Sequence, residues 1–157
     1  GDTDLAWTRI TGWRALLAAA LDQPPFEDVT SARVVGAADS PSADLLAAWL
    51  AFALRCPVTR TKVAGVDGLV NVALDRSSGA LELDRPGDEI ATLSAPGRDD
   101  RRVALPKRLD RDCLAEELRR LDPDETYAHV LSDGLTVLRE TGRITRSTSP
   151  KRRRGPR

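Results

Sequence analysis

Apolar residues recur at steps of three or four near the start of the chain. Between residues 4 and 21 this spacing places Trp7, Trp13 and several aliphatic residues on one side of a helix. The prolines of the following DQPP segment, 22–25, cannot donate to the helical hydrogen-bond ladder, so the helix ends there. The pattern therefore predicts one amphipathic N-terminal helix.

A short apolar segment, residues 31–38, is followed by a long and densely apolar one. Ser40 suits the N-cap of a helix, and Pro41 suits the first helical position, where a missing N–H costs nothing. Leucines, alanines, Trp and Phe then cover more than one stripe, which predicts a helix that is buried on several sides and ends at Pro57. A strand at 58–64 would pair in parallel with the strand at 31–38, which gives a βαβ unit.

Short strand-like segments come next, and turn signals separate them. Leu81 and Leu83 alternate with Glu82 and Asp84, as in an antiparallel sheet with one packed face and one wet face. The pattern predicts a meander that extends the sheet of the βαβ unit. Its expected strands are residues 58–64, 69–74, 80–85, 90–94 and 102–105.

Two helices are expected to close the fold. Leu114, Leu118 and Leu121 mark the first, and the DPD segment at 122–124 ends it and starts the second. The fold class is therefore α+β, or mixed α/β, with a helix, a βαβ unit, an antiparallel meander and two C-terminal helices. One globular domain is expected over residues 1–142. Residues 143–157 should form a disordered basic tail, because Ser, Thr, Pro and Arg bury too little apolar surface.

Charge is distributed unevenly along a chain whose formal net charge is zero. The tail holds seven Lys or Arg and no acid, so residues 1–142 carry 17 basic and 24 acidic side chains. An acidic body disfavours nucleic acid as a partner, which leaves only nonspecific attraction to the tail. Hydrophobic residues make up 41% of the chain and charged residues 31%, as in an ordinary soluble domain.

Nothing in the sequence predicts a membrane location. No stretch approaches the roughly 20 apolar residues that cross a bilayer, and the first residues lack the basic and apolar regions of a signal peptide. A cytoplasmic protein without a membrane partner is expected.

The sequence also lacks the usual motifs of catalysis. His129 is the only histidine, with no cysteine or second histidine nearby to complete a metal site. There is no G-x-S-x-G elbow, no Walker A loop and no G-x-G-x-x-G. We therefore expect no enzymatic activity, no cofactor and no metal.

The first helix combines residue types that are enriched at protein interfaces. Trp7, Arg9, Trp13 and Arg14 are candidate partner-binding residues, because Trp and Arg dominate interface hot spots. The alternative is that both tryptophans belong to the core, since they share the apolar stripe of the helix. Arg9 and Arg14 would then be the better contacts.

The turn from residue 38 to residue 46 is the most specific local feature. Asp39, Ser40 and Ser42 lie where a strand feeds a helix, and the amides of a helix N-terminus can bind an anion such as a sugar phosphate. However, Asp39 and Asp44 already place negative charge there. The alternative is that the turn only caps its own helix.

Several segments occur in the order that is typical of one known family, and together they resemble the C-terminal domain of OpcA, the glucose-6-phosphate dehydrogenase assembly protein. These segments are DLAWTRIT at 4–11, WR at 13–14, DQPP at 22–25, GAADSPSADLLAAWLA at 36–51, PV at 57–58, VALPKR at 103–108 and LAEELRRLDPDETY at 114–127.

This resemblance implies a non-catalytic protein that binds glucose-6-phosphate dehydrogenase and promotes its assembly or active state. In relatives the partnership responds to redox state through cysteines, which makes Cys56 and Cys113 candidate redox residues. Cys113 stands at the start of a helix, where the helix N-terminus would lower its pKa. The alternative function is a sensor or enzyme that binds a sugar phosphate or a nucleotide phosphate at Asp39 to Ser42.

Overall fold

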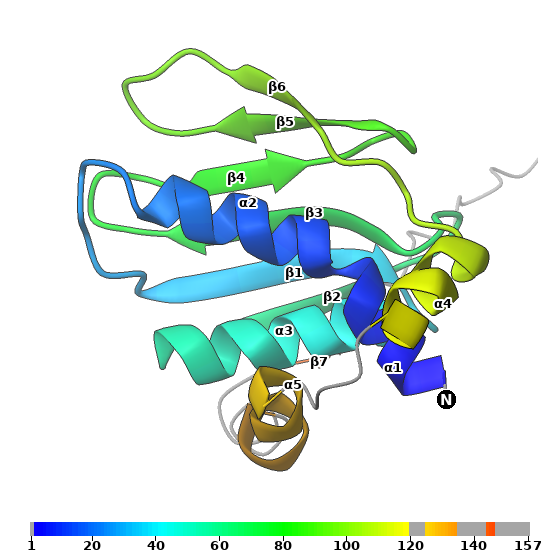
Figure 1. Cartoon of the computed structure of the whole chain (residues 1–157). Coiled ribbons are helices and arrows are strands. Elements are labelled where there is room, and N and C mark those ends of the chain that lie inside the picture. Colours follow the sequence, from blue (N-terminus) through cyan, green and yellow to red (C-terminus); the bar gives the residue numbers. More distant parts are fainter. Residues whose placement is uncertain (1, 120–124, 135–143, 147–157) are drawn as a thin grey trace, which may run out of the picture.

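The structure is a computed structural model that describes residues 2–119, 125–134 and 144–146. Its strands form one mixed sheet in the order β6-β5-β4-β3-β1-β2-β7 (Figure 1). The strands are β1 (Ser31–Ala37), β2 (Val58–Val63), β3 (Leu69–Asp75), β4 (Leu81–Asp84), β5 (Ile90–Ser94), β6 (Arg101–Ala104) and β7 (Ile144–Arg146). The helices are α1 (Asp2–Arg9), α2 (Thr11–Leu21), α3 (Pro41–Leu54), α4 (Asp110–Arg119), α5 (Glu125–His129) and the π-helical η1 (Val130–Gly134).

The pairing of the strands confirms the predicted α+β architecture. β1 pairs in parallel with β2 through the crossover helix α3, which makes the βαβ unit. On its other side β1 pairs antiparallel with β3, and β4, β5 and β6 follow as an antiparallel meander. β7 adds a parallel strand beside β2.

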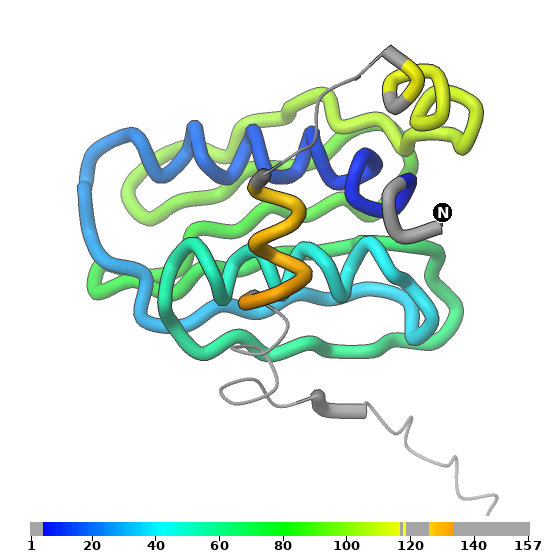
Figure 2. Tube along the Cα trace, turned by 60° about the horizontal axis from the view of Figure 1, so that its bottom comes forward, coloured from blue at the N-terminus to red at the C-terminus, as the bar shows by residue number. Residues whose placement is uncertain are grey.

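The helices lie on one side of the sheet. α2 and α3 run side by side over the same face, and α5 lies against the outer side of α3 (Figure 2). Alternate strand residues point into this layer, among them Val34, Val72, Leu74 and Leu83, each with 0% exposure. None of the described helices covers the opposite face (Figures 1 and 2), where the strands present half-exposed polar residues such as Thr61. The predicted packed and wet faces are thus confirmed.

α3 is enclosed by the sheet on one side and by α1 and η1 on others. Leu45, Leu46 and Leu50 are all buried, as expected for a helix with more than one apolar stripe. The Ser40 hydroxyl accepts a hydrogen bond from the Ala43 amide at 3.2 Å, and Pro41 occupies the first turn. The predicted helix start is therefore confirmed.

The N-terminal helix is divided, whereas the sequence predicts a single one. At Ile10 the backbone leaves the regular ladder, with φ −88° and ψ 3°, and the Ile10 amide donates to the carbonyl of Trp7 at 3.2 Å. The break lets α1 pack against α3 and α4 while α2 runs along the sheet (Figure 1). One straight helix could not bury both apolar faces against these neighbours.

The C-terminal elements are described only in part. α4 confirms the first closing helix, and the second begins as α5 and continues as the π-helical η1. Residues 135–142 of the predicted domain lie outside the described residues, as does the predicted tail apart from β7. No helix in the described ranges has the length and apolar character needed to cross a bilayer.

A close approach at the end of β1 gives a stability prediction. A Cβ on Gly36 would lie 2.6 Å from the carbonyl oxygen of Gly68, which accepts a hydrogen bond from the Ala37 amide at 2.8 Å. We expect Gly36→Ala to lower the free energy of unfolding by about 1–3 kcal/mol in urea denaturation, because backbone must move. Gly87→Ala, whose Cβ meets no described atom within 4 Å, is the control. Equal stability of Gly36→Ala and the original chain would contradict the close approach.

Candidate functional site

A cavity of about 700 Å³ opens at the carboxyl end of β1, where the chain turns into α3. Its wall comes from the β1–α3 turn, the α1–α2 junction, the loop before β3 and the segment 107–111 that leads into α4. Ile10, Trp13 and Leu69 supply its apolar lining. The cavity therefore gathers parts of the chain that are distant in sequence.

Arg60 of β2 fixes the turn that forms one wall of this cavity. The side chain is 1% exposed, and its Nε donates to Asp44 Oδ1 at 2.9 Å. Its Nη atoms donate to the carbonyl oxygens of Gly36 and Ala37, the last residues of β1. One guanidinium thus joins β2, the end of β1 and the first turn of α3. Arg60 was not among the residues predicted from the sequence, because a single arginine in a strand candidate carries no signal of burial.

The predicted anion-binding turn is already occupied by its own hydrogen bonds. The Ser40 hydroxyl caps α3, and the Ser42 hydroxyl donates to the carbonyl of Ala6 at 3.2 Å. Both serines are buried, whereas Asp39 is exposed. All three residues line the cavity, but the hydroxyl geometry fits capping better than anion binding.

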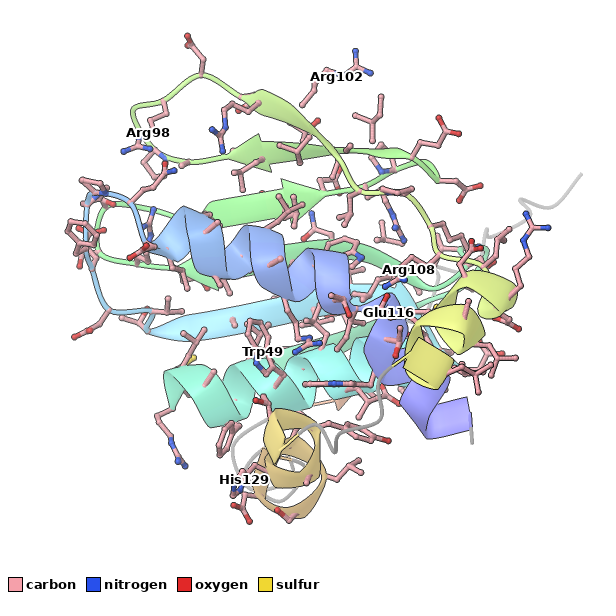
Figure 3. The ribbon with its side chains drawn as sticks, viewed as in Figure 1. Trp49, Arg98, Arg102, Arg108, Glu116 and His129 are labelled. Atoms are coloured by element: carbon pink, nitrogen blue, oxygen red, sulfur yellow. The ribbon has the colours of Figure 1, made fainter. Side chains whose placement is uncertain are left out.

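Basic side chains dominate the polar lining of the cavity, and most of them were not singled out from the sequence. Four belong to ion pairs, and in Figure 3 the side chains of Arg108 and Glu116 point toward one another. Two of the pairs attach the start of α4 and the segment before it to the rest of the domain, and the other two lie within residues 108–116. The four pairs are Arg9 with Asp110, Lys107 with Asp67, Arg108 with Glu116 and Arg111 with Asp112. The neighbouring Lys107 ammonium lowers the pKa of Asp67.

Arg85 lies beside this cavity without a carboxylate partner. It is 7% exposed, and its two Nη atoms donate to the carbonyl oxygens of Leu105 and Leu69, each at 3.1 Å. Its guanidinium carbon lies 5.1 Å from the centre of the Trp13 ring, and its buried Nε has no hydrogen-bond partner. Among the described residues no carboxylate lies within 4.0 Å, and burial lowers the pKa of Arg85.

The four residues predicted to bind a partner divide into two groups. Trp7 and Trp13 are each 2% exposed, so the structure places them in the core, which leaves almost no indole surface for a partner. The Arg14 guanidinium carbon lies 3.8 Å from the centre of the Trp7 ring, and Arg9 pairs with Asp110. This placement favours the core interpretation for the tryptophans. Arg9 lines the cavity, and the partly buried Arg14 lies over the Trp7 ring.

Both cysteines are buried, with 6% exposure for Cys56 and 0% for Cys113. Burial raises the pKa of both thiols, and the nearby Arg108 and Arg9 only partly oppose this at Cys113. The helix N-terminus was expected to lower the pKa of Cys113. That expectation is corrected, because desolvation outweighs the favourable charges.

His129 is exposed and stacks on Phe52, with ring centres 6.1 Å apart. Its Nδ1 lies 3.8 Å from Asp133 Oδ2. In the described part of the chain, no three His, Cys, Asp or Glu side chains are grouped closely enough to hold a metal ion.

Residues 1–131 match the family described as the C-terminal domain of a glucose-6-phosphate dehydrogenase subunit, which is OpcA. The chain belongs to this family. The resemblance expected for the OpcA segments is therefore confirmed.

The other comparisons add little to the OpcA family match. No curated protein is significantly similar to the chain. Among solved structures, KijD10, a 3-ketoreductase from Actinomadura kijaniata solved as a point mutant with TDP-benzene and NADP, is 13% identical with a TM-score of 0.44. The match covers 92% of this chain and 61% of that one, and a likeness this low carries no argument about function.

The ion pair of the buried Arg60 predicts a selective stability loss in this member of the OpcA family. Asp44→Ala leaves the Arg60 guanidinium with carbonyl partners only, so we expect a loss of about 1–2 kcal/mol in the free energy of unfolding, since the Asp44 side chain is itself 49% exposed. Asp39→Ala removes an exposed acid from the same turn and should change stability by less than about 0.5 kcal/mol. Urea denaturation of both variants measures the difference. Equal losses would show that Arg60 does not depend on Asp44.

Thiol titration tests the burial of the two cysteines. At pH 8 the native chain should react with a thiol reagent at least about a hundredfold more slowly than the chain in guanidinium chloride, since both thiols are neutral and enclosed. Free cysteine in the same buffer is the reference. Rapid labelling of Cys113 in the native protein would contradict the raised pKa and restore the redox hypothesis.

Proposed function

We propose that this chain is a non-catalytic, cytoplasmic protein that binds glucose-6-phosphate dehydrogenase and promotes its active oligomeric state, in the pentose phosphate pathway. The observation that supports this most is the match of residues 1–131 to a family described as part of a subunit of that enzyme. The catalytic groups would then belong to the dehydrogenase, and this chain would contribute only a surface that binds it.

Such a protein acts through binding energy alone. It shifts the dehydrogenase between states only as far as it binds one state more tightly than the other. A preference of about 1.4 kcal/mol changes the ratio of the two states tenfold, which a few well-placed side chains supply. No catalytic residue is required in the domain.

The outward face of α4 is the surface that best fits this role. Leu114 and Leu118 are 51% and 73% exposed, one helical turn apart, and Leu109 just before the helix is 50% exposed. Cys113 of the same helix points into the protein. Asp110 pairs with Arg9 of α1, and Glu116 pairs with Arg108, which donates to the carbonyl of Thr8 in α1 at 3.1 Å. These contacts hold α4 against the domain. Exposed leucines on an anchored helix offer a partner apolar area without the cost of ordering a loop.

Paired substitutions test this surface against purified glucose-6-phosphate dehydrogenase. Leu118→Ser should weaken binding by about tenfold or more, because it removes exposed apolar contact without disturbing the core. Phe26→Ser is the matched control, since Phe26 is 74% exposed and its loop lies at the opposite end of the sheet from α4 (Figure 1). Fluorescence anisotropy of the labelled chain, followed by activity of the dehydrogenase, reports both effects.

Two outcomes would contradict the proposed partnership, and a third would relocate its surface. The unaltered chain binding no dehydrogenase at micromolar concentrations would exclude the partnership. Reduction of NADP⁺ by the purified chain with glucose 6-phosphate, abolished by a substitution within the chain, would show that the domain has catalytic groups of its own. Equal weakening by Leu118→Ser and Phe26→Ser would move the contact surface away from α4.

A further inference from the structure

We propose that the β6 edge of the sheet pairs with the same edge of a second copy of this chain, so that two sheets join into one. The contact involves β6 (Arg101–Ala104) and the two acids directly before it, Asp99 and Asp100. Residues 99–104 are called the charged edge below. This inference goes beyond the proposed partnership with the dehydrogenase and does not depend on it, because α4 takes no part in the contact.

β6 is an outer strand of the sheet, and only one of its two sides is paired. It pairs with β5, and Figure 1 shows none of the other described elements beyond it. Arg101, Arg102 and Ala104 are exposed. An unpaired row of backbone N–H and C=O groups is a template for another strand. The charged edge is therefore open to pairing with a further strand.

The hydrogen bonding of β6 shows which of its residues would pair. The Leu105 amide donates to the carbonyl of Glu89 at 2.9 Å, so Leu105 and every second residue before it direct their backbone groups toward β5. The residues between them, Arg102 and Ala104, direct theirs away from the sheet. Continued by one step, the same alternation includes Asp100. Asp100 and Arg102 can therefore exchange backbone hydrogen bonds with a second copy.

The charges of this edge are self-complementary in an antiparallel pair. Around a two-fold axis at Arg101, Asp100 of one copy lies directly opposite Arg102 of the other, and the symmetry forms the same pair twice. Asp99 of each copy lies diagonal to Arg101 of the other, a separation that long side chains bridge. Among the described residues, none of these four side chains has an oppositely charged group within 4.0 Å. Pairing would give each of them one.

The same charges select one register. A shift by two residues in one direction would place Arg102 opposite Arg102, and a shift in the other direction would place Asp100 opposite Asp100. Like charges directly opposite one another destabilise a strand pair. Charged side chains commonly protect an edge strand against pairing. Here they exclude the shifted registers and favour the one centred on Arg101.

The charged edge is held in place by the rest of the domain. Arg98 Nη1 donates to Gln23 Oε1 at 2.9 Å, and Arg98 Nη2 donates to the carbonyl of Pro24. On the inner side, Arg101 pairs with the buried Leu93 of β5. A strand that is already ordered loses little conformational entropy when it pairs. Because the segment is short, the contact is smaller than that of a stable dimer, and we expect a Kd on the order of 0.1 mM.

Sedimentation velocity of the purified chain alone tests the pairing, so failure here is distinct from failure of the dehydrogenase partnership. At low ionic strength the chain should pass from monomer to dimer between about 10 μM and 1 mM. Salt at about 0.5 M should weaken the dimer at least tenfold, because it screens exposed ion pairs.

Charge-reversal variants test the register. Arg102→Asp and Asp100→Arg should each weaken dimerisation by about tenfold or more, since each places like charges opposite one another. An equal mixture of the two variants should form a heterodimer as tight as the original dimer, because every directly opposed pair again has opposite charges. Arg33→Asp is the matched control and should leave dimerisation unchanged, since it reverses an exposed charge on β1, in the interior of the sheet. Circular dichroism verifies that each variant is folded.

Three results would overturn the inference. They are a monomer at every concentration up to about 1 mM in low salt, an equal weakening by Arg33→Asp and Arg102→Asp, and a mixture of the two folded charge-reversal variants that stays monomeric.

Discussion

The buried guanidinium of Arg60 is the constraint on which the arrangement of this domain depends. It reaches from β2 to the last carbonyls of β1 and to Asp44 in the first turn of α3. Because the Arg60 side chain is 1% exposed, protein groups must supply its hydrogen-bond acceptors. These acceptors come from the elements of the βαβ unit, whose relative positions the guanidinium therefore constrains. The β1–α3 turn, which lines the cavity, is therefore joined to β2 by side-chain hydrogen bonds.

From this unit the rest of the domain is built outward. The meander from β3 to β6 widens the sheet, and the helices gather on one face, with α4 attached at one end through ion pairs of Arg9 and Arg108 (Figure 1). These pairs border the cavity, while the exposed leucines of α4 face away from the core.

Much of the fold was predictable from local signals. The cap at Ser40, the proline after it and the alternation of Leu81 and Leu83 each have a local physical cause, and all three were confirmed. The break at Ile10 was not predictable, because the apolar spacing continues through it and only packing against α3 and α4 decides it. Likewise, the cavity joins Arg9, Arg85 and Lys107, which are distant in sequence. The burial of Cys113 also depends on tertiary packing. Its position at the start of a helix, from which a lowered pKa was predicted, gives no information on that burial.

The central claim is that this member of the OpcA family acts by offering a surface to glucose-6-phosphate dehydrogenase. Amide hydrogen exchange of the chain, with and without the purified dehydrogenase, tests it most directly, since protection reports which backbone segments become covered. We predict slower exchange in α4 and the residues just before it, with the loop around Phe26 unchanged. Identical exchange throughout the chain at a saturating concentration of dehydrogenase would contradict the claim.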